Sequence, residues 1–158
     1  MNPSEYDVTY SVKEWLIHHS WRVVAFDPPG AQGTFSIPNP SKKEKGYKGQ
    51  TGTQSPDIIA IKNNIILIIE CKDYGDLKIK QDIIKLNEFL QNESRMNVFE
   101  KIIVHACKAN EILLTFDNSK IIFAKAHGGS NLLLQKNIET FHVKIIKNWD
   151  KTMINPTI

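Results

Sequence analysis

The feature that most constrains this chain is a pair of isoleucine-rich runs separated by two asparagines. The runs cover residues 58–61 and 65–69, with Pro56 shortly before them and Gly75 shortly after. Short apolar runs bounded by such residues are typical of core strands. Asn63 and Asn64 tolerate positive φ, which a two-residue hairpin turn requires. The sequence therefore predicts an antiparallel hairpin buried in the centre of a sheet.

Polar side chains lie at the open end of this predicted hairpin. The antiparallel return brings Asp57 alongside Glu70, and alternation along the second strand places Glu70 and Lys72 on one face with Cys71 on the other. Carboxylate oxygens suit Mg²⁺ or Mn²⁺, and two carboxylates leave coordination positions for a backbone carbonyl, waters and substrate oxygens. Such a metal activates water and neutralises phosphate charge, while Lys72 positions the nucleophile or stabilises the transition state. We therefore expect Mg²⁺-assisted hydrolysis of phosphodiesters, in which Mn²⁺ substitutes for Mg²⁺.

The run PDIIAIKNNIILIIECK, residues 56–72, resembles the core hairpin of the PD-(D/E)XK nuclease superfamily. It is most similar to archaeal-type Holliday-junction resolvases and small type II restriction endonucleases. The resemblance implies that Asp57 and Glu70 bind the metal, that the Cys71 carbonyl is a further ligand and that Lys72 is the catalytic lysine. It also implies a restriction endonuclease-like α/β fold, with a mixed central sheet of about four to five strands flanked by helices in the order α-β-β-β-α-β.

A first helix is expected from about Ser4 to Ser20, with Ser4 as its N-cap, followed by a strand over residues 21–26. In resolvase-like members of the superfamily, a glutamate on this helix completes the metal site. The matching position here is Thr9, so the third acid is out of register. Glu5 lies one turn earlier on the same face and is the substitute, although dipole compensation explains it equally well. Glu14 lies too near the other end of the helix.

Basic side chains gather in a long loop at about residues 27–55, which is rich in Gly and Pro. Its lysines lead into the proposed site and suggest an arm that grips DNA phosphates, although lysine-rich loops are also often merely solvated. A second basic group is expected where a helix over about residues 81–91 begins. The candidate DNA-binding residues are Lys42, Lys43, Lys45, Lys48, Lys78, Lys80 and Gln81.

The remaining segments are predicted from shorter patterns. Residues 101–106 and 120–126 are expected to be strands, residues 109–116 a short helix, and residues 141–149 are undecided between strand and helix. With 158 residues, of which 41% are hydrophobic and 23% charged, the chain fits one compact nuclease domain over 1–158. No long apolar run or signal pattern is present, so a cytoplasmic protein without a membrane partner is expected. The two cysteines are expected to be buried thiols, and no organic cofactor is indicated.

Three functions fit these observations. The first is a type II restriction endonuclease acting on double-stranded DNA, favoured because the chain is only mildly basic (pI about 8.8). The second is a Holliday-junction resolvase, favoured by the hairpin itself. Either enzyme must cut two strands with one site per chain, which predicts a symmetric homodimer. The third is a catalytically idle DNA-binding module on the same fold, which the missing acid at Thr9 permits.

Overall fold

The computed structural model describes residues 3–30, 35–38, 55–73, 76–128, 138–145 and 152–153. Its helices are α1 (Glu5–His18), α3 (Asp76–Leu90) and α4 (Glu93–Ala109), with a 3₁₀ turn η1 (Phe116–Asn118). Its main strands are β1 (Arg22–Phe26), β2 (Ile58–Lys62), β3 (Ile65–Lys72), β4 (Lys120–His127) and β5 (Glu139–His142). Two short strands, β6 (Lys144–Ile145) and β7 (Thr152–Met153), pair separately.

The five main strands form one mixed sheet in the order β1-β2-β3-β4-β5. β1, β2 and β3 are antiparallel neighbours, whereas β4 runs parallel to β3 and β5 parallel to β4. The central strand β3 is therefore shared by an antiparallel hairpin and a parallel crossover through α3 and α4. This arrangement confirms the expected restriction endonuclease-like α/β fold with a mixed sheet.

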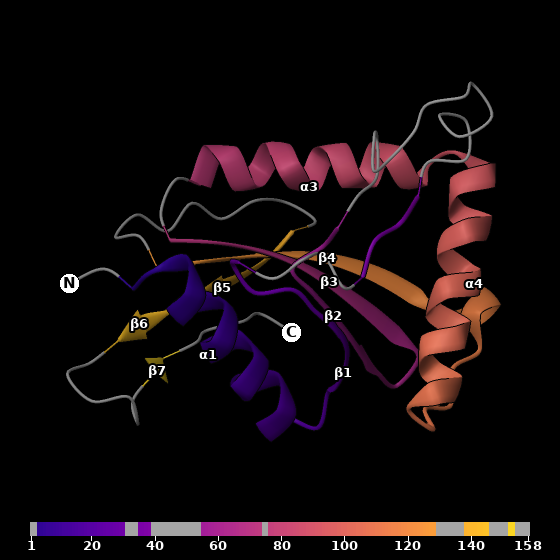
Figure 1. The fold of residues 1–158 in the computed structure, drawn as a ribbon, viewed down its shortest axis with the longest axis horizontal. Coiled ribbons are helices and arrows are strands. Elements are labelled where there is room, and N and C mark those ends of the chain that lie inside the picture. Colours follow the sequence, from indigo (N-terminus) through magenta and orange to yellow (C-terminus); the bar gives the residue numbers. More distant parts are fainter. Residues whose placement is uncertain are drawn as a thin grey trace.

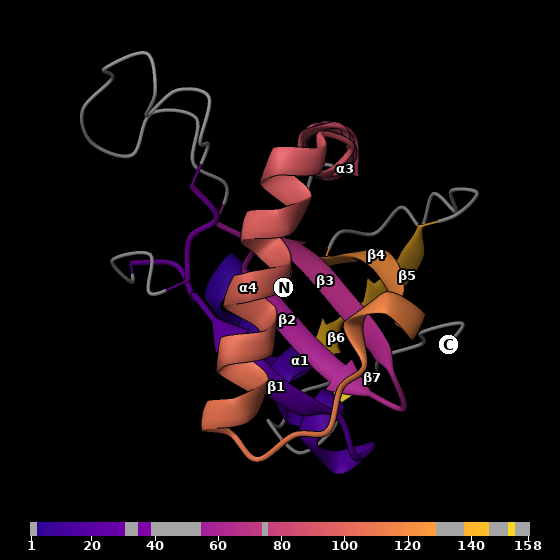
Figure 2. The ribbon, with the colours of Figure 1, turned by 90° about the vertical axis from the view of Figure 1, so that its right-hand side faces the viewer.

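The sheet is covered on both faces (Figure 1 and Figure 2). On one face α1 packs through Val8, Val12 and Leu16 against the alternate strand residues that include Leu67 and Ile69. On the other face α3 and α4 pack against the intervening residues of the same strands, which explains why the runs 58–61 of β2 and 65–69 of β3 are continuously apolar. In the residues described, α1 and α3 both begin at the end of the sheet where β3 finishes (Figure 1), so their positive dipole ends lie near Glu70 and Lys72.

The β2–β3 turn has the predicted conformation. Asn63 and Asn64 both adopt positive φ, at 47° and 63°. The Asn64 amide also exchanges two hydrogen bonds with the Thr115 backbone, donating to its carbonyl (3.1 Å) and accepting from its N–H (2.9 Å). The turn is thus fixed to the segment that leads into β4, and this sets the hairpin register.

The N-terminus of α1 also follows the sequence. Ser4 is the N-cap, and its hydroxyl accepts from the Asp7 N–H (3.2 Å) while the Asp7 carboxylate accepts from the Ser4 N–H (2.9 Å). This reciprocal capping box satisfies two of the helix's otherwise unpaired donors. It fixes the first turn, which contains Glu5.

The expected strand at residues 101–106 is wrong, because these residues lie in the middle of α4. An apolar run this short cannot be distinguished from a buried helical segment by its composition. The helix is revealed by Asn92, whose side chain caps it at Arg95 N–H, and by a buried stripe at spacings of four residues, Phe99, Ile103 and Cys107. The short helix expected at 109–116 is also wrong: α4 ends at Ala109, and only a 3₁₀ turn follows.

Other helix and strand boundaries differ from those predicted from the sequence. α3 begins at Asp76, five residues before the expected start, so Lys78 and Lys80 lie inside the helix and not before it. On this helix Ile84 is 40% exposed, whereas Phe89 is buried. The undecided segment at 141–149 contains the end of β5 and the strand β6, and residues 146–149 lie outside the described ranges. Among the helices that the structure describes, none is long and apolar enough to cross a membrane.

Candidate active site

Asp57 and Glu70 face each other at the open end of the hairpin. Because Ile58 pairs with Ile69, the next residues outward on the two strands are Asp57 and Glu70. Their side chains are hydrogen-bonded to each other. Asp57 Oδ2 also accepts the backbone N–H of Cys71 at 2.7 Å, which fixes its carboxylate plane. The predicted juxtaposition of the two acids is therefore present.

Lys72 is the last residue of β3 and lies just beyond this acid pair. Its ammonium forms an ion pair with Glu5 in the first turn of α1, with Nζ 3.1 Å from Oε1. Both side chains remain partly accessible, at 20% for Lys72 and 31% for Glu5. The structure thus brings Glu5 to the site through Lys72, whereas Glu14 is exposed elsewhere on the helix.

Thr9, the position where superfamily members place an acid, is completely buried. Its hydroxyl donates to the Glu5 carbonyl (2.7 Å) and is also hydrogen-bonded to the Cys71 thiol. An acid at this position would enter the apolar layer between α1 and β3 at a high desolvation cost. Glu5, one turn nearer the N-terminus, is partly solvated and can carry its charge.

The start of α1 is held close to the end of the sheet by a glycine. A Cβ on Gly128, just after β4, would collide with the Pro3 ring. The Gly128 N–H donates to the Asp73 carbonyl at 3.2 Å, which joins the ends of β3 and β4. Only glycine permits this approach, and the approach keeps Glu5 within reach of Lys72.

Burial and mutual repulsion dominate the electrostatics of the acid pair. Burial raises the pKa of Asp57 to about 6, against the lowering effect of the Cys71 N–H and the Lys72 ammonium. Burial, the Asp57 charge and the Asp82 charge on α3 raise the pKa of Glu70 to about 9, although Lys72 opposes this shift. At neutral pH one carboxyl of the pair therefore retains a proton.

A divalent cation fits this donor set. Two buried carboxylates that repel each other are stabilised when a cation replaces the shared proton, and hard oxygen ligands match Mg²⁺ or Mn²⁺. In the described parts of the chain, no three His, Cys, Asp or Glu side chains gather as a metal-binding group. The acid pair would therefore need a backbone carbonyl, waters and phosphate oxygens to complete the coordination shell.

Most of the candidate DNA-binding lysines lie outside the residues whose side chains the structure describes. Lys42, Lys43, Lys45 and Lys48 lie in residues 39–54, outside the described residues. Lys78 and Lys80 lie in the first turns of α3, where the backbone alone is described. Gln81 is exposed on the same helix. Their contact with DNA remains a prediction.

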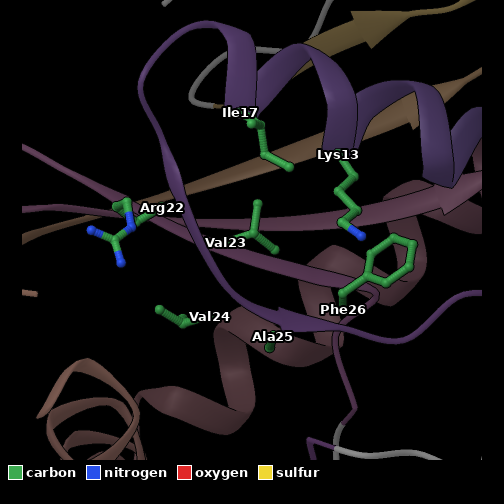
Figure 3. Close-up of a pocket in the computed structure, with 7 residues that line it drawn as sticks. All are labelled: Lys13, Ile17, Arg22, Val23, Val24, Ala25 and Phe26. Carbon is green, nitrogen blue, oxygen red and sulfur yellow. The ribbon is translucent and has the colours of Figure 1, made fainter. Parts of the chain in front are cut away.

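A hollow of about 410 Å³ lies elsewhere, along the edge strand β1 (Figure 3). Its lining consists of Lys13, Ile17 and the residues of β1. The Lys13 ammonium lies 4.4 Å from the centre of the Phe26 ring, a cation–π contact. The lining contains no carboxylate, so the hollow is separate from the acid pair.

Two residues near the acids were not predicted from the sequence. Asp82 influences Glu70 from α3, and Lys125 is the β4 residue paired with Glu70 in the sheet register. Asp82 lies inside the helix that the sequence predicted, but no local pattern indicates that this helix brings it near Glu70. Lys125 lies in a correctly predicted strand, and a charged residue inside an apolar run was the available signal.

Comparison with known families places part of this chain near a nuclease family. Residues 44–118 match the model of the archaeal Holliday junction resolvase (hjc) family, a family of PD-(D/E)XK nucleases. The matched segment covers just under half of the chain and includes Asp57, Glu70 and Lys72. No curated protein and no solved structure matches the chain. The match confirms the superfamily resemblance and indicates a nuclease core, and it favours the resolvase interpretation over the restriction interpretation.

Proposed function

We propose that this chain, which has the PD-(D/E)XK fold and hairpin and is similar to archaeal Holliday-junction resolvases, is a metal-dependent endonuclease that cuts four-way DNA junctions. The observation that supports it most is the pairing of Asp57 with Glu70 at the end of β3, beside Lys72, inside the segment that matches the resolvase family. The same segment offers no specific support for restriction of duplex DNA.

In this mechanism Asp57, Glu70 and the Cys71 carbonyl would hold a divalent cation, with Mg²⁺ as the physiological ion and Mn²⁺ as a substitute. When bound there, such an ion would offer positive charge to the phosphate and lower the pKa of a water molecule. The Cys71 N–H keeps Asp57 oriented, so little reorganisation is needed when the substrate arrives.

Lys72 orients the attacking water and stabilises charge on the phosphate. Its ion pair with Glu5 holds the ammonium at the end of β3. Glu5 is then a positioning residue for Lys72, and it would be the third acid available to help hold a cation. The N-terminal ends of α1 and α3 add a favourable potential for the phosphate backbone.

Two cuts are needed to resolve a junction, whereas the residues that the structure describes contain one acid pair of this kind. A symmetric homodimer is therefore part of the proposal. The single domain over residues 1–158 would supply one site, and the lysines of residues 39–54 would contact DNA outside it.

The test uses the purified protein with Mg²⁺ and three substrates: a synthetic four-way junction, a linear duplex containing the same arms, and a plasmid. Paired cuts in the junction and an intact duplex would support the proposal. Discrete plasmid fragments would instead identify a restriction enzyme. Inactivity on all three, with junction binding retained, would indicate an idle binding module. Asp57→Ala serves as the control for contaminating nuclease.

A further inference from the structure

The sheet face beneath α3 is apolar near the hairpin turn and becomes polar towards the other end of the strands. The change occurs at one row of residues that are neighbours across adjacent strands. Towards the hairpin turn, β3 and β4 present Ile68 and Phe123 to α3 and α4. One step further along, the parallel register pairs Glu70 with Lys125, and β5 adds Thr140 opposite Lys125. Asp57, directly before β2, extends this row across the sheet from β5 through β4 and β3. Alternation along each strand directs all four side chains to the α3 side.

Lys125 is the unusual member of the row, because its exposed fraction is 0%. Lysine is almost never fully buried unless its charge is compensated. Burial costs several kcal/mol per ion, and an apolar residue of the same volume often gives equal or better stability. Packing alone therefore does not account for a lysine at this position.

The surroundings of Glu70 explain what a positive charge would do there. Asp57 and Asp82 both place negative charge near Glu70. Lys72 is shared with Glu5 at the end of the strand. Neighbouring strands lie about 4.8 Å apart, so Lys125 stands directly beside Glu70, on the side opposite Asp57.

We propose that Lys125 is a positioning residue that holds Glu70 in the orientation needed to bind the metal. Its charge offsets the repulsion that Glu70 receives from Asp57 and Asp82, and it does so without reaching the substrate, because it is completely buried. This inference rests on the proposed function. Groups that orient metal ligands typically alter metal affinity or activity about 10- to 100-fold when they are removed.

The test replaces Lys125 with Met, which keeps the length of the side chain and removes its charge. We expect a folded protein that binds the junction in Ca²⁺ as tightly as the wild type. Its cleavage rate should fall about tenfold or more, and the Mg²⁺ concentration for half-maximal rate should rise by a similar factor. Lys125→Arg, which keeps the charge, should retain more of both properties.

Phe123→Leu is the matched control, since Phe123 lies on the same strand and the same face, two residues earlier. It should lower the melting temperature and leave the Mg²⁺ dependence unchanged. A Lys125→Met protein that behaves like this control would overturn the inference. Cleavage by Lys125→Met at the wild-type rate, or with a lower Mg²⁺ requirement than the wild type, would also overturn it. If Lys125→Met does not fold, the same measurements on Lys125→Arg and Lys125→Gln decide, and equal Mg²⁺ requirements in these two variants would overturn it.

Calorimetric measurement of Mn²⁺ binding separates this inference from the proposed function. If the wild type cuts none of the three substrates, the proposed function fails. Weaker Mn²⁺ binding by Lys125→Met than by the wild type would still support the positioning role, whereas equal binding would reject it.

Discussion

Glu70→Gln should stabilise the metal-free protein while abolishing its activity. In the folded chain the pKa of Glu70 is raised to about 9, so the folded state keeps a proton that the unfolded state releases above its ordinary value of 4.5. Folded protein therefore loses stability as pH rises from about 5 to about 9. Glutamine resembles the protonated carboxyl and carries no such penalty.

The magnitude follows from the linkage relation. At pH 7 the pH lies about 2.5 units above the ordinary pKa, and one unit corresponds to about 1.4 kcal/mol, which gives an upper value of about 3 kcal/mol. Relaxation around a coupled pair reduces this, so we expect about 1–3 kcal/mol. For a chain of this size, that is an increase of about 3–10 °C in melting temperature.

The assay is thermal unfolding from pH 5 to pH 9 in EDTA. Wild-type stability should decline across this range, while Glu70→Gln should show a smaller slope. Addition of Mg²⁺ should stabilise the wild type and have little effect on the variant. Glu14→Gln, an exposed acid on α1, should change stability by less than about 0.5 kcal/mol. If Glu70→Gln melts at or below the wild-type temperature at pH 8, Glu70 does not carry the penalty that its raised pKa implies.

Three further outcomes are expected. Glu5→Gln should leave the melting temperature nearly unchanged, because a partly exposed ion pair contributes only about 0–1 kcal/mol, yet it should slow junction cleavage, and full activity would exclude a role for Glu5. Phe99→Ala removes a fully buried ring and should cost about 3–5 kcal/mol in urea unfolding, so a loss below 1 kcal/mol would contradict its place in the core. Asn64→Ala should cost about 1–3 kcal/mol through its lost hydrogen bonds and strained φ, with cleavage per folded molecule unchanged, and an altered cleavage rate would link the turn to the site.

The hairpin was predictable because several local signals agree. Isoleucine runs indicate strands, Asn63 and Asn64 indicate the turn, and the turn fixes the register that brings Asp57 to Glu70. The capping box at Ser4 similarly fixed the start of α1. At each of these places the local preference and the final packing demand the same conformation.

The errors arose where local patterns are ambiguous. Residues 101–106 have the composition of a strand, and only contacts with distant residues decide that they are helical. The ion pair of Lys72 with Glu5 joins residues 67 positions apart, and the pairing of Lys125 with Glu70 depends on how β4 enters the sheet. No local pattern specifies these distances, so the juxtaposition of Asp57 with Glu70 was predicted from the sequence but its surroundings were not.

We propose above all that Asp57, Glu70 and Lys72 form a metal-dependent site for junction cleavage. The most direct test measures single-turnover cleavage of a four-way junction in Mg²⁺ by the wild type, Asp57→Ala and Lys72→Ala, with junction binding measured in Ca²⁺ for all three. We expect that only the wild type cleaves the junction and that all three proteins bind it. Cleavage by either variant at the wild-type rate, or wild-type cleavage that persists in EDTA, would contradict this proposal.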